Sequence, residues 1–499
     1  MAEYIPFEKL SADAKAEYEE LQAKLKDGAL TPKDRMAIPQ QEMPTDEPKA
    51  RARKMSEVAL GYTVEQAVVE ANRCLQCKNA PCMQGCPVSV PIPDFIAHVA
   101  KGEFKEAVDV IKTTNLLPAI CGRVCPQEKQ CQGSCTVGKT YKNAEKAVSI
   151  GRLERFVADY ERNNNLETTP AVAKETGKKV AIIGSGPSGL TVAADVRRAG
   201  HSVTVFEAFH KAGGVMVYGI PEFRLPKAIV AKEIDNLKAM GVEFRTNFLV
   251  GRTGTLPQLL KEQGYDAAFI GTGAGLPKFM KIDGENLIGV FSANEYLTRA
   301  NLMKAYDREH ADTPLYEAKH VVVCGGGNVA MDAARMAYRL GAEQVDIIYR
   351  RTRNEMPARK EEVAHAEEEG VNFRFLENPV NILGDETGHV RAVTALSYEL
   401  GEPDASGRRS PVAIKGSEHE IECDAVIVAL GNGSNPLMAK TTPGLDVDAK
   451  GHIVVDETGK TSIDGVWAGG DIVLGAATVI LAMGEGRRAA AGINAYLAK

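Results

Sequence analysis

The sequence predicts an α/β protein in which a helical, cysteine-rich domain precedes two Rossmann-like units, each with a parallel sheet. Three observations support this fold class. Eight of the ten cysteines lie between Cys74 and Cys135. Few β-branched runs precede Lys178, whereas two later stretches each contain an apolar strand, a glycine-rich turn and a helix start. Because such stretches are typical of βαβ units, the later two thirds of the chain should hold the sheets.

The length, charge and hydrophobic pattern of the chain limit the classes of function that it can have. The 499 residues allow about three domains with buried cores. A formal charge of −6 argues against nucleic acid as the main partner. The first residues lack the basic-then-apolar layout of a signal peptide, and no apolar run approaches the roughly 20 residues of a membrane helix. We therefore expect a cytoplasmic protein with reduced thiols and no membrane segment.

The first third of the chain should be mostly helical. Residues 1–60 are polar and charged, and we interpret them as an extension that wraps the surface, with an exposed helix near Ser11 to Lys24. Helical patterns then surround the cysteines, and Asn163 to Gly177 is a polar linker. The expected helices of this domain cover residues 65–73, 92–113 and 147–161.

The clustered cysteines form two groups of four, and each group contains a Cys-Pro pair. Iron–sulfur clusters take mostly cysteine ligands, and a cysteine before proline commonly ligates the other cluster of a pair. Disulfides suit small secreted domains, and structural zinc prefers two CxxC pairs, of which this stretch has one. We therefore predict two 4Fe–4S clusters that share ligands across the groups, which are Cys74, Cys77, Cys82 and Cys86, and Cys121, Cys125, Cys131 and Cys135.

The first glycine-rich turn follows the apolar strand Lys179 to Ile183 and has the form GxGxxG. Gly184 permits the tight turn, Gly186 lets the backbone approach a pyrophosphate, and Gly189 allows close helix packing. Glu207 ends the next strand, where an acid accepts hydrogen bonds from ribose hydroxyls. A lone GxGxxG is a weak signal, but strand, helix and acid together indicate a dinucleotide site, which suits FAD.

The second turn, Gly325 to Ala330, has the related GxGxxA form and also follows an apolar strand. Where the first unit has an acid, this unit has Arg350 and Arg351, with Arg353 beyond them. Guanidinium groups there suit the 2′-phosphate of NADP, which an acid would repel. The alternative is a solvated basic loop. We prefer an NADPH site because this is the position that the Rossmann geometry assigns to the ribose.

Further glycine clusters fit nucleotide loops when taken together, although each alone is more often a plain turn. Two buried strands that end in glycine, at residues 267–275 and 424–433, suggest a crossover between the two nucleotide domains. The isolated Cys324 and Cys423 are expected in the core as small residues. The other clusters are Gly213 and Gly214, Gly219, Gly469 to Asp471, and the glycine-containing helix from Thr478 to Ala491.

Several strings of the sequence together carry a resemblance to a known family. They are Cys74-Leu-Gln-Cys77, Cys86-Pro-Val, Cys121-Gly-Arg-Val-Cys125-Pro-Gln-Glu, Ile150-Gly-Arg-Leu-Glu-Arg-Phe156, Gly184-Ser-Gly-Pro-Ser-Gly189, Tyr218 to Pro226, Tyr349-Arg-Arg351 and Gly469-Gly-Asp471. Over about residues 50–499 the chain resembles the small (β) subunit family of NADPH-dependent glutamate synthase. It looks closer still to the large subunit of NADH-dependent ferredoxin:NADP oxidoreductase, because of the string at Cys121. The amino-terminal part of dihydropyrimidine dehydrogenase is similar too.

The resemblance implies a helical domain with two 4Fe–4S clusters, then an FAD domain that an NADP domain interrupts. The corresponding segments are 1–60 (extension), 61–170 (clusters), 171–295 and 425–499 (FAD), and 296–424 (NADP). The resemblance assigns one cluster to Cys74, Cys77, Cys82 and Cys135. It assigns the other to Cys86, Cys125, Cys131 and an oxygen donor that falls on Glu154, although by spacing alone Cys121 is the rival fourth ligand.

The implied function is that of an NADPH-dependent oxidoreductase subunit, in which electrons pass from NADPH to FAD and through the clusters to a partner. That partner would be a smaller ferredoxin-NAD reductase-like flavoprotein with its own cluster, in which case the flavin could bifurcate electrons. An alternative partner is the large, amidotransferase subunit of glutamate synthase, to which this chain would deliver electrons. An alternative function, in another class, is that of a non-enzymatic cluster-bearing scaffold. No side chain needs to act as acid or base in hydride transfer, so no catalytic residue is assigned.

The candidate cofactor-binding residues come from the two units and from the later glycine clusters. They are Gly184, Gly186, Pro187, Ser188, Gly189, Glu207, Gly213, Gly214, Gly219, Arg224, Gly271, Thr272, Gly273, Gly325, Gly327, Asn328, Val329, Ala330, Arg350, Arg351, Gly431, Gly470, Asp471 and Thr478. The resemblance places Asp471 near the ribityl chain and pyrophosphate of the flavin.

Overall fold

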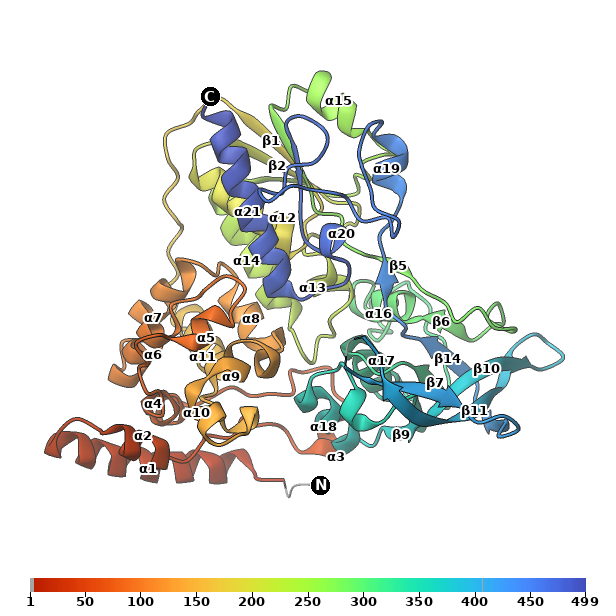
Figure 1. The fold of residues 1–499 in the computed structure, drawn as a ribbon, viewed down its shortest axis with the longest axis horizontal. Helices are drawn as coiled ribbons and strands as arrows, with labels where there is room; N and C mark the ends of the chain where they lie inside the picture. The colour runs from red at the N-terminus through yellow and green to blue at the C-terminus, as the bar shows by residue number, and fades with distance from the viewer. Residues whose placement is uncertain (1–3, 406) are drawn as a thin grey trace.

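A computed structural model describes residues 4–405 and 407–499. Figure 1 shows a helical domain (orange), a first α/β lobe above it and a second α/β lobe beside it. This arrangement confirms the predicted fold class. Among the described helices, none combines the length and the apolar composition that crossing a bilayer requires.

The described residues before Lys179 form helices and turns but no strand. The expected helix over 92–113 is two helices, because Gly102 adopts a left-handed conformation (φ 80°) and ends the first of them. The elements of the helical domain are α4 (Val64–Asn72), α5 (Pro81–Gln84), α6 (Ile92–Lys101), α7 (Phe104–Lys112), α8 (Pro118–Val124), η1 (Gln127–Lys129), α9 (Cys131–Ser134), α10 (Thr136–Thr140), η2 (Ala144–Lys146) and α11 (Ile150–Asn163).

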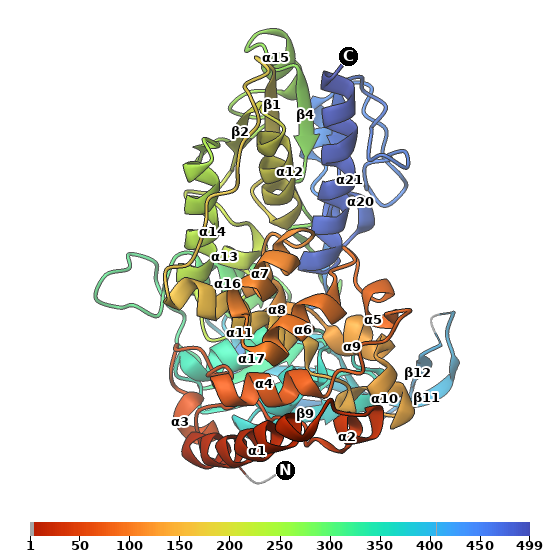
Figure 2. The same cartoon turned by 90° about the vertical axis from the view of Figure 1, so that its left-hand side faces the viewer.

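The N-terminal extension runs along the outside of the molecule, where Figure 2 shows its long first helix lying across the helical domain. It contains α1 (Phe7–Asp27), α2 (Pro32–Ala37) and α3 (Pro48–Arg51). Helix α1 packs on α4, and only Ala14 and Leu21 of α1 are buried. Further along, the amide of Val58 donates to the carbonyl of Phe223, so the extension also reaches the α/β part.

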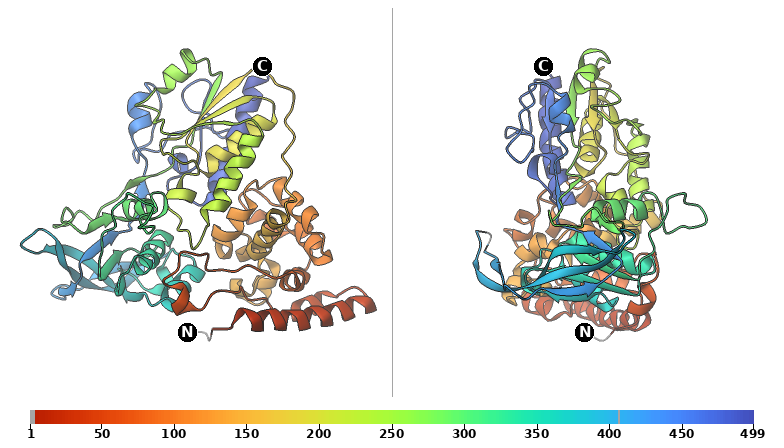
Figure 3. Two further views of the ribbon diagram at one scale, coloured as in Figure 1. Left: turned by 180° about the vertical axis from the view of Figure 1, so that it is seen from behind. Right: turned by 90° about the vertical axis from the view of Figure 1, so that its right-hand side faces the viewer.

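The first lobe is built on a five-stranded parallel sheet in the order β16-β4-β1-β2-β3. Helices α12 and α21 pack side by side against this sheet, as Figure 3 shows from behind. The elements are β1 (Lys179–Ile183), α12 (Pro187–Arg198), β2 (Ser202–Phe206), α13 (Val215–Tyr218), α14 (Lys227–Ala239), β3 (Glu243–Arg245), α15 (Leu256–Lys261), β4 (Ala267–Ile270), α19 (Leu437–Thr441), β16 (Val466–Ala468), α20 (Asp471–Leu474) and α21 (Val479–Leu497).

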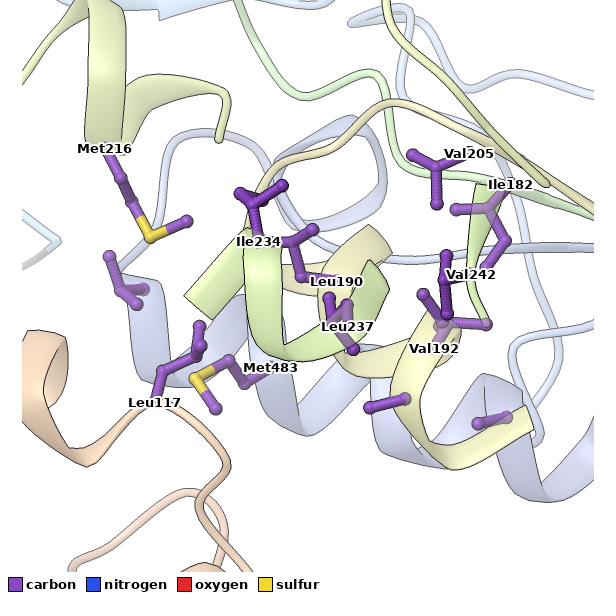
Figure 4. Packing of buried hydrophobic residues seen from close by; sticks show 14 of the residues in the cluster. Leu117, Ile182, Leu190, Val192, Val205, Met216, Ile234, Leu237, Val242 and Met483 are labelled. Carbon is purple, nitrogen blue, oxygen red and sulfur yellow. The ribbon is translucent and has the colours of Figure 1, made fainter. Parts of the chain in front are cut away.

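The core of the first lobe continues into the helical domain. Leu117, which precedes α8, lies beside Met483 of α21 in the same buried cluster as Leu190 of α12 (Figure 4). Burial of such side chains stabilises a structure by about 1.5–3 kcal/mol each, so this shared core fixes the helical domain on the first lobe.

The second lobe has its own five-stranded parallel sheet, in the order β6-β14-β7-β8-β9. Cys324 and Cys423 lie in the buried core of this lobe, as expected. The elements are β6 (Val290–Ser292), α16 (Ala293–Asn301), β7 (His320–Cys324), α17 (Asn328–Arg339), β8 (Gln344–Tyr349), η3 (Arg353–Glu355), α18 (Lys360–Glu368), β9 (Asn372–Phe375), β14 (Ala425–Val428), and the antiparallel strands β10 (Glu377–Gly384), β11 (Val390–Pro403), β12 (Arg409–Ala413) and β13 (His419–Glu422).

The chain crosses between the lobes twice, at one place. Strands β5 (Leu276–Pro277) and β15 (Asn432–Gly433) pair antiparallel and form a two-stranded ribbon there. Strand β6 lies in the second sheet although it precedes residue 296, and β14 lies there although it follows residue 424. The pairing therefore moves both expected boundaries of the interrupting domain outward, to the ribbon.

Candidate functional site

The first glycine-rich turn has the geometry that its motif requires. Gly184 has φ 100°, and a Cβ built on it would lie 2.4 Å from the carbonyl oxygen of Gly271 at the end of β4. A Cβ on Gly189 would lie 2.0 Å from the carbonyl oxygen of Gly184, so α12 could not begin so close to β1 with any other residue. A Cβ on Gly186 would meet open space, which fits the approach of a phosphate group.

Glu207 is buried and holds the turn together. Its carboxylate accepts hydrogen bonds from the amide and hydroxyl of Ser185 (3.1 and 2.5 Å) and from the amide of Phe209 (2.9 Å). The Ser185 hydroxyl in turn accepts from the amide of Gly213 (2.8 Å), and a Cβ on Gly214 would lie 2.8 Å from Cα of Gly186. The structure thus brings Gly213 and Gly214 onto the first turn through Ser185, which the motif leaves unassigned.

The C-terminal segment meets the same turn. The Ser188 hydroxyl lies 3.3 Å from the carbonyl oxygen of Gly469, and Thr478 caps α21 by accepting from the amide of Leu481. Asp471 accepts from the amide of Ala477 (3.2 Å), and burial raises the pKa of its carboxyl to about 6. The contact of Ser188 with Gly469, and the 2.7 Å between a Cβ on Gly470 and the Ser188 hydroxyl, place Gly470 beside the first turn, and Asp471 follows it directly in the sequence.

The other candidate cofactor-binding residues of the first lobe lie at different distances from the first glycine-rich turn. Gly271 faces Ser188, a Cβ on Gly273 would meet open space, and Thr272 is exposed between them. Gly219 lies against Val215 at the end of α13. Arg224 does not join these residues, because its side chain, 7% exposed, forms ion pairs with second-lobe carboxylates, Asp332 at 2.6 Å and Glu362 at 3.1 Å.

The second turn repeats the geometry of the first. Gly325 has φ 144°, and a Cβ on it would lie 2.5 Å from the carbonyl oxygen of Ala429, just beyond β14. Gly327 precedes α17, whose first residues are Asn328, Val329 and Ala330. The Asn328 side chain accepts from the amide of Arg359 (2.8 Å). Gly431 (φ 88°) has open space at its Cβ position.

The arginines at the end of β8 have unlike surroundings. Arg350 is exposed, and no partner for its guanidinium is found among the described residues. Arg351 is only 7% exposed, and its guanidinium binds the carboxylate of Asp404 (2.7 Å) and the carbonyl oxygen of Arg409 (2.7 Å). Arg353 is exposed and pairs with Glu367. Asp404 and Arg409 border the turn between β11 and β12, so this turn covers Arg351.

Four of the cysteines line one small apolar cavity in the helical domain, namely Cys74, Cys77, Cys82 and Cys135. Ile92, Ile96 and Val148 close its sides. All ten cysteines are among the described residues, and all have free thiols. No three acidic, histidine or cysteine side chains of the described chain converge on one point as a single ion would require. In a 4Fe–4S cluster each thiolate binds a different iron, and the four cysteines around this cavity are the number that one cluster takes.

The other four cysteines of the helical domain gather around a buried carboxyl group. Burial, with nearby Glu154, Cys86 and Cys125, raises the pKa of the Cys131 thiol. Glu154 is 9% exposed, and burial raises its pKa to about 8. Its charge also contributes to the raised pKa of Cys86, after burial. The structure therefore brings Cys86, Cys125, Cys131 and Glu154 together, with Cys121 beside them on α8.

Comparisons with known proteins agree with these two kinds of site. Residues 51–166 match the family model of the dihydropyrimidine dehydrogenase domain II with a 4Fe–4S cluster, and residues 178–486 match that of the pyridine nucleotide-disulphide oxidoreductases. The glutamate synthase [NADPH] small chain of Azospirillum brasilense is 40% identical over 466 residues, which are 91% of this chain and 94% of the relative. The counterpart in Escherichia coli is 38% identical, over 90% and 95%.

Two further similarities extend the comparison. The NADP(+)-dependent formate dehydrogenase subunit beta of Moorella thermoacetica is 40% identical over 84% of this chain and 60% of its own length. The structure of Mycobacterium tuberculosis FprA in complex with NADPH shares the fold, with a TM-score of 0.53 and 20% sequence identity over 64% of this chain and 84% of the other.

Proposed function

Since the chain belongs to the family of NADPH-dependent glutamate synthase small chains, we propose that it is the electron-input subunit of an NADPH-dependent oxidoreductase. One observation carries the proposal: two glycine-rich turns of matching geometry, at Gly184 and Gly325, lie in one chain with the clustered cysteines. The first turn is followed by an acid and the second by arginines, which suits FAD and NADPH respectively. When bound, FAD and the 4Fe–4S clusters convert a hydride into single electrons and relay them.

The residues of the chain would bind and orient these groups. The first turn offers its amides and the α12 N-terminus to the pyrophosphate of FAD, with Asp471 and Thr478 beside it. The second turn does the same for NADPH, and Arg350 is the guanidinium available to its 2′-phosphate. We assign Cys74, Cys77, Cys82 and Cys135 to one cluster, and Cys86, Cys125, Cys131 and Glu154 to the other.

We expect a double substitution of Arg350 and Arg351 by alanine to raise KM for NADPH far more than KM for NADH. A charged contact to phosphate contributes about 1.5–3 kcal/mol, which corresponds to roughly a 10- to 140-fold rise. The measurement is steady-state reduction of an artificial acceptor by each nucleotide. Equal changes for both nucleotides would mean that the 2′-phosphate binds elsewhere.

The partner decides between two readings of the proposal. The family strings at Cys121 favour a ferredoxin:NADP oxidoreductase, whereas close relatives carry the name of a glutamate synthase subunit. Purifying the native complex without oxygen tests them. A smaller partner with its own flavin and cluster supports the first reading and calls for a bifurcation assay. A much larger partner with glutaminase activity supports the second. A chain that purifies alone contradicts the relay to a partner subunit.

The same preparation tests the scaffold alternative. Bleaching of bound flavin by NADPH excludes a non-enzymatic scaffold. Because clusters with cysteine ligands need reduced thiols, we propose the cytoplasm as the compartment.

A further inference from the structure

Asn115, in the turn before α8, is a completely buried amide between the two rival donors for the second cluster. Its Nδ2 donates to Oε1 of Glu154 at 2.6 Å. Its Oδ1 accepts from the thiol of Cys121 (Sγ to Oδ1, 3.7 Å) and from the amide of Leu117 at 3.0 Å. One side chain therefore touches both Glu154 and Cys121.

The hydrogen bond to Glu154 fixes the orientation of the carboxylate. Glu154 lies on α11 and Asn115 in a separate segment, so the bond ties two elements of the helical domain together. Only one oxygen is engaged, since no donor within the described residues reaches Oε2. The second oxygen is thus the one that remains for iron, on a carboxylate whose charge acts on the Cys86 and Cys131 thiols.

The contacts of Cys121 hold its sulfur on the opposite side of the amide. Sγ lies 3.7 Å from Sδ of Met483 on α21, and the side chain is 1% exposed. The carbonyl of Cys121 also accepts from Nε2 of Gln127 (3.3 Å). Met483 belongs to the first lobe, so Cys121 lies where the helical domain meets that lobe, with the Cys125 thiol also beside it.

We propose that Asn115 is the positioning residue that makes Glu154, and not Cys121, the fourth ligand of the second cluster. The proposal rests on the assignment of that cluster made above. The amide presents Glu154 by donating to one carboxylate oxygen and retains Cys121 by accepting from its thiol. Hydrogen-bond partners of metal ligands commonly set ligand orientation in this way.

The test is electron paramagnetic resonance of the dithionite-reduced holoprotein carrying Asn115→Leu, which removes both contacts at similar volume. We expect the wild-type signal of the second cluster to fall about 10-fold or more. A new signal should replace it, because Cys121 is then free to bind iron. Adding Cys121→Ala should abolish the new signal and halve the iron content, whereas Cys121→Ala alone should leave the wild-type signal unchanged.

Controls separate positioning from loss of folding. Asn301→Leu makes the same change at another buried amide, far from the cysteines in sequence, and should leave both cluster signals intact. Flavin content and the first-cluster signal report on folding, and Asn115→Ala serves as the second variant if Asn115→Leu does not accumulate. An unchanged second-cluster signal in either Asn115 variant overturns the proposal. Loss of the cluster with no Cys121-dependent signal overturns the part that concerns Cys121.

A separate variant tests the assignment of Glu154 as the fourth ligand of the second cluster. If Glu154→Ala leaves the second-cluster signal as in the wild type, the assignment of Glu154 fails, whatever Asn115→Leu shows. If Glu154→Ala changes the signal and Asn115→Leu does not, only the positioning role fails.

Discussion

The strand-end arginines show how much a single neighbour changes a residue's part in a site. Arg350 and Arg351 are adjacent in sequence, yet one is exposed and the other is already bound by Asp404. A carboxylate on a guanidinium occupies the same hydrogen-bonding positions that a phosphate would use. We therefore propose that Asp404 competes with the 2′-phosphate of NADPH for Arg351.

We expect Asp404→Asn to lower KM for NADPH about 2- to 5-fold. This change corresponds to the free energy that a partly exposed ion pair contributes. Asparagine keeps an acceptor oxygen for the amide of Arg408, so the turn should remain. KM for NADH should not change, because NADH lacks the 2′-phosphate. Asp448→Asn is the matched control, since Asp448 accepts from Lys450 and His452 in a similar turn of the first lobe. Weaker NADPH binding in Asp404→Asn would contradict the competition.

At the scale of elements, the short helix α3 joins the N-terminal extension to the second lobe. Arg51, with a side chain that is 2% exposed, pairs with Glu368 and with Glu369 at 3.2 Å on the far side of the domain boundary. Glu369 also pairs with Arg335 and Arg339. Although burial opposes it, Arg335 and Arg339 hold the pKa of Glu369 well below its usual range, so the network stays ionised.

We expect Arg51→Ala to destabilise the protein by about 3 kcal/mol, because removing one partner leaves buried charge uncompensated. Lys54→Ala is the control: its side chain is 55% exposed and lies 4.0 Å from Asp46, so the change should be about 0.5 kcal/mol or less. Thermal unfolding of the holoprotein compares the two. Equal melting temperatures would show that the extension does not hold the second lobe.

At the scale of the whole molecule, the second lobe also contacts the cysteine-rich domain directly. Arg359 is buried and donates to the carbonyl of Arg123 (2.9 Å) and to the side chain of Gln127 (3.1 Å). Lys129 donates to the carbonyl of Pro357 (2.8 Å). The amide of Arg359 holds Asn328, so one segment touches both the second glycine turn and the loop beside the cysteines.

We expect Arg359→Ala to slow the reduction of bound flavin by NADPH about 10-fold, because hydride transfer is sensitive to misplacement of the nucleotide lobe. Stopped-flow absorbance of the flavin is the measurement. Lys360→Ala is the control, since its exposed side chain joins the same lobe and domain through a surface ion pair with Glu145, a residue that is far from the second glycine turn in sequence. If both variants react like the wild type, the contact between lobe and domain has no part in the transfer.

The sequence alone determined the features that depend on local chemistry. The cysteine groups, the two βαβ units and the helical first third could be predicted, because glycine at a left-handed φ, apolar periodicity and Cys-Pro spacing are properties of neighbouring residues. The crossover at residues 267–275 and 424–433 was also recognisable, since both strands end in the same glycine pattern. The family strings added the order of the cofactor domains.

Only the tertiary structure decided which distant groups meet. Arg224 lies in a motif string but is engaged by Asp332, and Arg351 is engaged by Asp404. Ser185 stands at an unassigned position of its motif and Asn115 stands in none. Ser185 nevertheless links Glu207 to the Gly213 turn, and Asn115 contacts both Glu154 and Cys121. A charge or an amide has no periodicity that reveals its partner, because the partner comes from another part of the chain and is set by packing.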